Sequence, residues 1–379
     1  MATPLPAPGR ARSTPPDAAE VLLLSRGLVS AVAPATGLSV VQGELIKAVC
    51  TAMTGYPADL AADPVTPDDL GRGLAARGLE FRTRIVQLMV LCALVLRPLP
   101  PEVARRVGEF AAELGVEEGM LDVARELAEG SLGLASLDFE RNGYTAAWSS
   151  AAADALHTSS ALTSAWDAAA DDPDLARRWA ALEALDPGTL GKRVTEFYRA
   201  RGFVYPGLPG SAPPLLAQHD WVHVVADYGT TVESELEVFA FIARANEDMH
   251  AFSLLAMVVS LFETGYLQQG AGLFLASPGH LAETGMATRV ADAMRRGAQC
   301  QGSIDFLGLD WFELADLPVD AARAHFAVPP KSDEALAVGS VGPWEAGGIS
   351  PFQVKAGAAL AEADHRPYQS YGARVLPGS

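Results

Sequence analysis

The chain has 379 residues, of which 49% are hydrophobic and 20% are charged. This is the composition of a folded protein with room for two or three domains. Its 28 basic and 46 acidic side chains give a formal net charge of −18. The excess of acid disfavours nucleic-acid binding, because phosphates are bound by cations. It also disfavours electrostatic attachment to anionic lipid, so any membrane contact would have to be hydrophobic.

The predicted elements divide the chain into five parts. Residues 1–16 are rich in Pro, Ala and Arg and are expected to be a flexible arm. Apolar residues recur at spacings of three and four over 17–148, which predicts a helical domain. Residues 149–180, dominated by Ala, Ser and Asp, are interpreted as a connection, and a second helical domain follows over 181–330. Residues 331–379, rich in Gly, Pro and Ala, are expected to be a disordered tail.

The predicted fold class is all-α with two helical domains, because alternating β-branched runs are scarce throughout. The three cysteines, Cys50, Cys92 and Cys300, are far apart and form no Cys-x-x-Cys pair, so neither a disulfide framework nor a thiolate zinc site is expected. The N-terminus has Pro and Arg where a secretory signal needs a continuous apolar run. The sequence therefore predicts a cytoplasmic protein, either free or peripheral to a membrane.

The segment 218–235, QHDWVHVVADYGTTVESE, contains the residues most suited to chemistry. His219 and His223 are four residues apart, so on a helix they share one face and can close on one metal ion. Asp220 points about 100° away from His219, so it can reach the same site only by bending round or by orienting a ligand.

A helical hairpin is predicted to add a third ligand. Gly229 is expected to end the first helix through a positive φ, and Thr230 with Glu233 matches a capping box that begins the second. Glu235 then lies in the first turns of the second helix, where it can fold back against the two histidines. Two imidazoles and a carboxylate suit a divalent metal with a position left for water or substrate. Ordinary core or surface histidines are the alternative interpretation.

This segment resembles the motif of the coenzyme Q (ubiquinone) biosynthesis protein 4 family, in which His-Asp-x-x-His is followed by eleven residues and then Glu. Here the eleven are residues 224–234. The resemblance extends over residues 183–330 through flanking pieces that look like the family's entry turn, helices and exit: Leu185 to Gly191, Phe197-Tyr198, Arg296-Gly297, Asp310-Trp311, Leu317-Pro318 and Val328-Pro329.

The resemblance implies metal ligands at His219, Asp220, His223 and Glu235, with zinc the usual metal and iron the second candidate. It implies an all-helical, peripherally membrane-associated protein that holds a prenyl or other lipid tail and is involved in C1 decarboxylation and hydroxylation of a quinone head-group precursor. Asp220 would be the catalytic residue of such a metal-dependent decarboxylase or lyase. The implied partners are a prenylated aromatic or lipid molecule and a biosynthetic complex or a second copy, with no nucleic acid.

The N-terminal domain is weakly similar to the TerB-like helical domains of tellurite-resistance proteins. The similarity rests on Gly43-Glu44, on residues 84–88 (RIVQL) and on Leu114-Gly115-Val116. It implies that Glu44 and Asp68 lie near a cation site, whereas solvated carboxylates are the simpler interpretation. Simple members of the coenzyme Q family lack this domain and the long tail.

Two further features have open interpretations. The apolar segment 251–267 is either a central core helix or the wall of a lipid groove, in which Met257, Val258, Phe262 and Tyr266 would face an acyl or prenyl chain. Arg295 and Arg296 are expected on an exposed charged face, with contact to an acidic ring substituent as the alternative.

Three functions are compatible with these observations. The first is a metal-dependent protein that acts on or binds a prenylated aromatic head-group precursor. The second is a non-catalytic lipid-binding or scaffold protein in which zinc braces the hairpin, and such a structural site should have four protein ligands. The third is a metalloprotease, because His-Asp-x-x-His differs from the His-Glu-x-x-His helix by one methylene in the acid.

Overall fold

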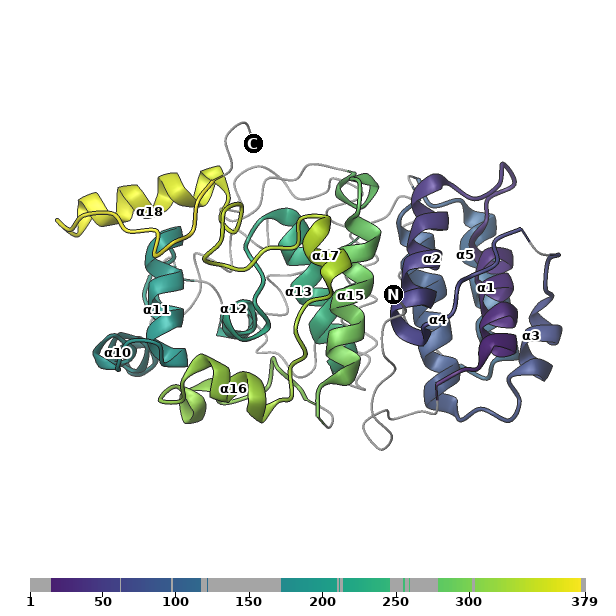
Figure 1. Ribbon diagram of the computed structural model, residues 1–379, viewed down its shortest axis with the longest axis horizontal. Coiled ribbons are helices and arrows are strands. Elements are labelled where there is room, and N and C mark those ends of the chain that lie inside the picture. Colours follow the sequence, from purple (N-terminus) through teal and green to yellow (C-terminus); the bar gives the residue numbers. More distant parts are fainter. Residues whose placement is uncertain are drawn as a thin grey trace.

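The computed structural model is helical, and the predicted all-α class is confirmed (Figure 1). Isolated β-bridges, such as the one between Thr189 and Pro318, occur within the described residues, but no β-strand does. The structure describes residues 15–61, 63–96, 98–116, 121, 172–209, 211, 214–245, 255, 259, 279–301 and 304–375.

Helices near the N-terminus form one packed body. They are α1 (Ala18–Val32), α2 (Val40–Thr54), α3 (Pro67–Gly73), α4 (Leu79–Leu94) and α5 (Pro101–Glu113). Asp17 and Ser39 begin α1 and α2 with capping boxes, and Gly55 ends α2 in the left-handed conformation. Helices α1, α2 and α5 pack against α4, which is buried around most of its surface. Gln42 is buried here, and its amide donates to the carbonyls of Val32 and Cys92.

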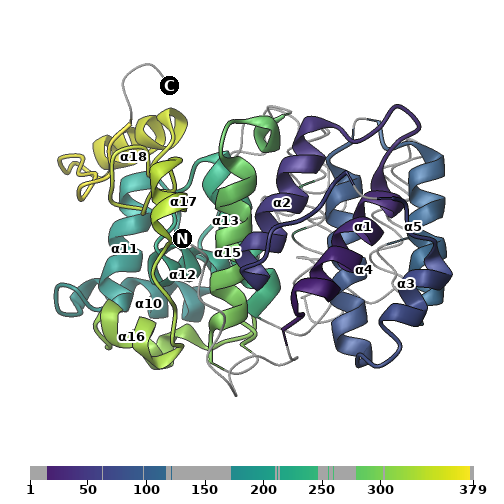
Figure 2. The same ribbon diagram turned by 45° about the vertical axis from the view of Figure 1, so that its right-hand side comes forward.

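The second body includes a closely packed pair of helices. It contains α10 (Pro173–Ala181), α11 (Leu190–Arg201), α12 (Pro214–Ala226), α13 (Val232–Ala245), α15 (Met286–Gln299) and α16 (Val319–His325). Helices α13 and α15 pack closely along each other, and α15 also packs against α2 of the first body (Figures 1 and 2). Gly297 on α15 allows this approach, because a Cβ there would lie 2.1 Å from the carbonyl oxygen of Phe241.

The expectation of a disordered tail is wrong for residues 331–375. This part of the chain contains α17 (Asp333–Ala337) and α18 (Pro351–Ala363), and α18 packs against α11. Its Gly and Ala residues lack an apolar period, but their small size allows close backbone contact. A Cβ on Gly357, for example, would lie 2.4 Å from the carbonyl oxygen of Ala200. The segment is ordered by these contacts with the second body.

The end of the predicted connection is also folded. Asp172 caps α10, and Trp179 on that helix is 3% exposed and packs against Tyr198 and Trp221. Residues 173–181 therefore pack as part of the second body. The rest of the connection, and residues 1–14 of the predicted arm, lie outside the described residues.

The predicted lipid-groove segment also lies almost wholly outside the described part of the chain. Of residues 251–267 the structure describes only Leu255 and Val259, both of which are buried. Among the helices that are described, none has the length and apolar character needed to cross a membrane. Cys50, Cys92 and Cys300 are all buried.

Candidate metal site

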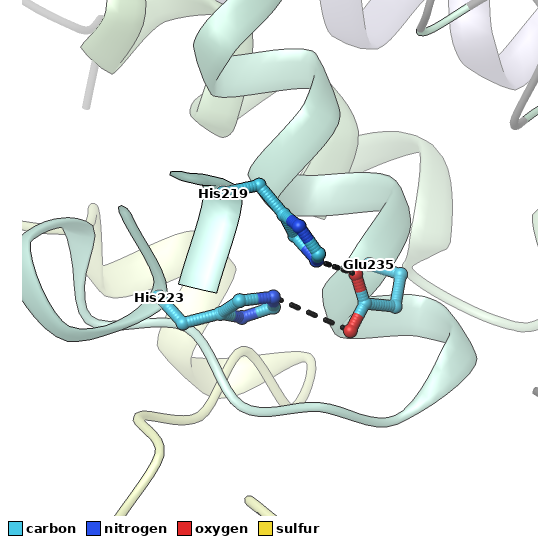
Figure 3. Close-up of side chains that lie close together, drawn as sticks. All are labelled: His219, His223 and Glu235. Carbon is cyan, nitrogen blue, oxygen red and sulfur yellow. Dashed lines mark ion pairs between the residues drawn. The ribbon is translucent and has the colours of Figure 1, made fainter. Parts of the chain in front are cut away.

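The α12–α13 hairpin brings His219, His223 and Glu235 together, as the spacing predicted (Figure 3). Both histidines lie on one face of α12, and Glu235 points toward them from the first turns of α13. The Nε2 atom of His219 lies 3.4 Å from one carboxylate oxygen of Glu235, and Nε2 of His223 lies 3.3 Å from the other. One ligand atom from each residue lies within 4.8 Å of the others, and all three side chains are buried.

The turn of the hairpin differs from the predicted one. Helix α12 ends at Ala226, and Asp227 takes the left-handed conformation with φ of 64°. Gly229 has no positive φ. It is instead needed for close approach, because a Cβ there would lie 2.8 Å from the Cα atom of Gly348. The hydroxyl oxygen of Thr231, the residue before α13, accepts a hydrogen bond from the Ser234 amide. The predicted capping box from Thr230 is therefore not formed.

Hydrogen bonding and stacking fix both imidazole rings. The Nδ1 atom of His223 lies 3.3 Å from the carbonyl oxygen of Tyr228. Because a carbonyl only accepts, Nδ1 donates to it, and Nε2 of the same ring is directed at Glu235. The ring of His223 stacks on Phe197, and that of His219 stacks on Phe239. A hydrogen bond from the second ring nitrogen to a backbone carbonyl, as at His223, usually orients a metal-binding histidine.

Asp220 lies at the edge of the same cluster. Its Oδ1 atom is 3.6 Å from Nε2 of His219, and its Oδ2 atom accepts a hydrogen bond of 2.6 Å from the hydroxyl of Tyr198. One oxygen therefore faces the histidines while the other is held from behind. The Asp220 side chain therefore bends round the helix toward His219, as it must if both residues are to share one site.

Burial and mutual charge set the ionisation of the two acids. Burial acts to raise the pKa of Glu235, but the neighbouring His223 and His219 outweigh it and bring the pKa to about 2. Burial raises the pKa of Asp220, an effect that His219, His223 and the Tyr198 hydroxyl oppose. Glu235 is therefore a carboxylate at neutral pH and supplies a permanent negative charge.

Arg201, at the end of α11, holds the hairpin to the C-terminal segment. It is fully buried, and its guanidinium donates to the Thr230 hydroxyl at 2.7 Å and to the carbonyls of Pro343 and Gly348, both at 2.8 Å. The Thr230 hydroxyl in turn donates to Gln353. Burial lowers the pKa of Arg201 to about 9, so it remains charged at neutral pH. Neither this arginine nor the segment around Gly348 was singled out by the sequence analysis.

The donor set is of a kind that can hold a divalent metal ion. Ligand atoms about 2.0–2.1 Å from zinc lie roughly 3.3 Å apart in a tetrahedron. The two histidine–glutamate separations are 3.3 and 3.4 Å, each to a different carboxylate oxygen, and one ligand atom from each of the three residues lies within 4.8 Å of the others. Within the described residues, Nε2 of His223 and Oε2 of Glu235 are buried without a hydrogen-bond partner. Polar atoms left in this way are costly unless something binds them.

Other residues singled out in the sequence do not join a site of this kind. Among the described residues, Glu44 and Asp68 belong to no cluster of three ligand groups, and Asp68 pairs with Arg72 at 3.0 Å on the surface. The expected exposure of Arg295 and Arg296 is wrong. Both are buried, with Arg295 paired to an aspartate one turn away and Arg296 bonded to a backbone carbonyl.

No protein-family model matches the sequence, and no curated protein matches it. The chain is similar to the crystal structure of a candidate ubiquinone biosynthesis protein from Nostoc punctiforme. The two are 21% identical, the match covers 56% of this chain and 98% of that chain, and the TM-score is 0.32. A TM-score of this size does not establish a common fold. The buried His219, His223 and Glu235 cluster is therefore the main guide to function.

Proposed function

We propose that the α12–α13 hairpin is a divalent metal site, with zinc the first candidate and iron the second. His219, His223 and Glu235 would hold the ion, and Asp220 would be the fourth ligand or act beside it. The observation that carries the proposal is the buried convergence of two imidazole nitrogens and a carboxylate, with one ligand atom of each residue within 4.8 Å of the others. One negative charge and two neutral imidazoles are a common catalytic zinc ligand set.

The function we propose is action on a prenylated aromatic head-group precursor, as in the coenzyme Q biosynthesis protein 4 family. The family's His-Asp-x-x-His and Glu elements meet in space here. Two flanking pieces of the resemblance also meet, because the Leu190 amide donates to the Leu317 carbonyl at 2.7 Å and Val319 donates to Gly188. Pieces of the motif that are far apart in sequence thus support one another structurally.

Each residue of the site has a separate role in the proposed chemistry. A divalent ion bound here would act as a Lewis acid toward a carboxylate or phenolate oxygen. His223 is kept in one tautomer by Tyr228, and His219 is held flat against Phe239. Asp220 keeps one oxygen on the cluster side and can orient a bound group or accept a proton there, while Tyr198 prevents it from turning away.

Elemental analysis of protein purified without chelator tests the metal site. We expect about one zinc or iron per chain in the wild type, and none in the double variant His219→Ala, His223→Ala. The matched control removes two exposed histidines, His325→Ala and His365→Ala, and should keep the metal. Equal metal content in the two double variants would refute the site.

Substrate chemistry tests the function separately. Metal-loaded protein should bind a prenylated 4-hydroxybenzoate, and Asp220→Asn should reduce its conversion more than its binding, since the proposed role is in the reaction step. The metal content of Asp220→Asn is measured in parallel, because a loss of metal would make Asp220 a ligand. If the protein holds metal but neither binds nor converts any prenylated hydroxybenzoate, the proposed substrate is wrong and the metal site stands.

A zinc-braced scaffold is the second candidate. The observation in its favour is that His219, Asp220, His223 and Glu235 are all at least 95% buried, and structural zinc sites are closed by four protein ligands. X-ray absorption of the zinc-loaded protein distinguishes the two. Four protein ligands without water favour the scaffold, whereas three ligands and a water favour the enzyme.

A further inference from the structure

The turn at the end of α12 bonds twice to one of the proposed metal ligands. The Tyr228 amide donates to the His223 carbonyl at 3.0 Å, and the Tyr228 carbonyl lies 3.3 Å from Nδ1 of the same histidine. The first bond belongs to a common helix-ending motif, in which the residue before the donor is left-handed. Asp227 is that residue, with φ of 64°. The orientation of the His223 ring therefore depends on the conformation of this turn.

An aspartate occupies a backbone position that glycine would fill with less strain. Residues with a Cβ disfavour the left-handed conformation, although Asp and Asn tolerate it best. The Asp227 carboxylate is held by cations from two other segments. Its Oδ1 atom lies 3.4 Å from Nη2 of Arg323, and its Oδ2 atom lies 3.9 Å from Nζ of Lys331. Gly342 leaves room for it, because a Cβ there would lie 2.5 Å from Oδ1.

Arg323, on α16, supplies donors that the end of α12 lacks. The last carbonyls of a helix have no partner within the helix, and α16 packs against α12 (Figure 1). The Nε atom of Arg323 donates to the Val225 carbonyl at 2.9 Å, and Nη2 donates to the Val224 carbonyl at 3.1 Å. One guanidinium therefore contacts three of the four residues that lie between His223 and Tyr228.

The side chain of Tyr228 is also restrained from outside the hairpin. Its ring is buried, and the ammonium nitrogen of Lys331 lies 5.1 Å from the ring centroid. The guanidinium carbon of Arg296, on α15, lies 4.9 Å from the same centroid. Cations at these distances are attracted to an aromatic ring. Residues 296–331 thus contact the backbone of the turn through Arg323 and its aromatic ring through Arg296 and Lys331.

We propose that Arg323 is a positioning residue for the metal ligand His223. It acts through the backbone of the turn and through Asp227, and it does not touch the ion. Without the guanidinium the turn would loosen, the Nδ1 atom of His223 would lose a fixed acceptor, and its Nε2 atom would no longer be held toward Glu235. Outer partners that orient a histidine in this way commonly change metal affinity by 10–100-fold. The proposal rests on the metal site proposed above.

Zinc affinity of the full chain, measured after removal of metal by competition with a chromophoric chelator, tests the proposal. Arg323→Met should weaken zinc binding by about 10–100-fold. The visible absorption of the Co²⁺-loaded chain reports ligand geometry and should change in the same variant. The matched control is Arg366→Met, which removes another partly exposed arginine that pairs with a nearby aspartate. It should leave both the affinity and the spectrum unchanged.

A second variant separates positioning from stability. Asp227→Gly removes the carboxylate that holds Arg323 but suits the left-handed φ. The metal-free variant should therefore melt no lower than the wild type. Its zinc affinity should nevertheless fall, by about threefold, because a partly exposed ion pair contributes modestly. A loss of affinity without a loss of stability is not expected from a residue that only supports the fold.

The failures of this proposal and of the metal site are distinguishable. If the wild type binds zinc, and folded Arg323→Met and Asp227→Gly bind it equally well with the same Co²⁺ spectrum, the positioning role is wrong and the metal site stands. An equal loss of affinity in Arg366→Met would also overturn the positioning role, because the effect would not be specific to the turn. A wild type that binds no zinc overturns the metal site and this proposal together.

Discussion

The two helical bodies bury different kinds of polar residue. The first body buries Ser25, Gln42, Thr54 and Gln87, and among its described residues no Asp, Glu, His, Lys or Arg is buried. The second body buries many ionisable side chains: Arg201, His219, Asp220, His223, Glu235, Glu237, Arg289, Asp292, Arg295 and Arg296. Burial of a charge is unfavourable unless a partner offsets it. The buried ionisable groups are therefore concentrated in the second body, while the first is an apolar framework.

Most buried charges of the second body have local partners. Glu237 pairs with Arg289 at 2.6 Å, and Asp292 pairs with Arg295 at 2.7 Å. The histidine–glutamate cluster differs, because its nitrogen–oxygen separations are 3.3 and 3.4 Å, longer than those of the two ion pairs. That difference separates the candidate site from the structural ion pairs around it.

The largest loss of stability is expected from a substitution of Arg201, and substitution of an exposed arginine is the control. Arg201→Met should lower the free energy of unfolding by about 3 kcal/mol or more, because Thr230 and two buried carbonyls lose their donor. Arg178→Met, which removes a half-exposed arginine that pairs with Asp310, should cost at most about 1 kcal/mol. Denaturant unfolding of both variants measures the difference. Equal losses would mean that the buried charge does not hold the second body together.

The next comparison is between glycine-to-alanine substitutions on one helix of each body. The two changes in stability should have opposite signs. Gly297→Ala should destabilise by about 1–3 kcal/mol, because its Cβ would meet the Phe241 carbonyl of α13. Gly108→Ala on α5 has nothing within 4 Å of its Cβ. It should therefore stabilise by up to about 1 kcal/mol, since alanine favours the helix. Thermal unfolding of the two variants gives the signs, and stabilisation by Gly297→Ala would contradict the α13–α15 packing.

The smallest expected effect is a pH dependence in the first body. A hydrogen bond from Arg77 to Glu20, 2.8 Å long, holds the pKa of Glu20 below its usual 4.5. The pair therefore stabilises the protein above about pH 4.5, and the contribution is lost as the pH falls through the folded-state pKa. Glu20→Gln should lower the melting temperature by about 1 °C at pH 7. The gap to wild type should narrow below pH 4.5, and a gap independent of pH would argue against the ion pair.

The sequence by itself determined the helical class and the meeting of His219, His223 and Glu235. Both follow from local rules, because a four-residue spacing sets a helix face and a short turn returns the chain to it. The sequence did not predict that residues 331–375 are folded or that Arg295 and Arg296 are buried. It also did not predict the close approach of Gly229 to the backbone of Gly348. Each depends on contacts between segments far apart in the chain. Only tertiary packing decided these features, since it determines which small residues admit a neighbouring backbone and which charges find partners.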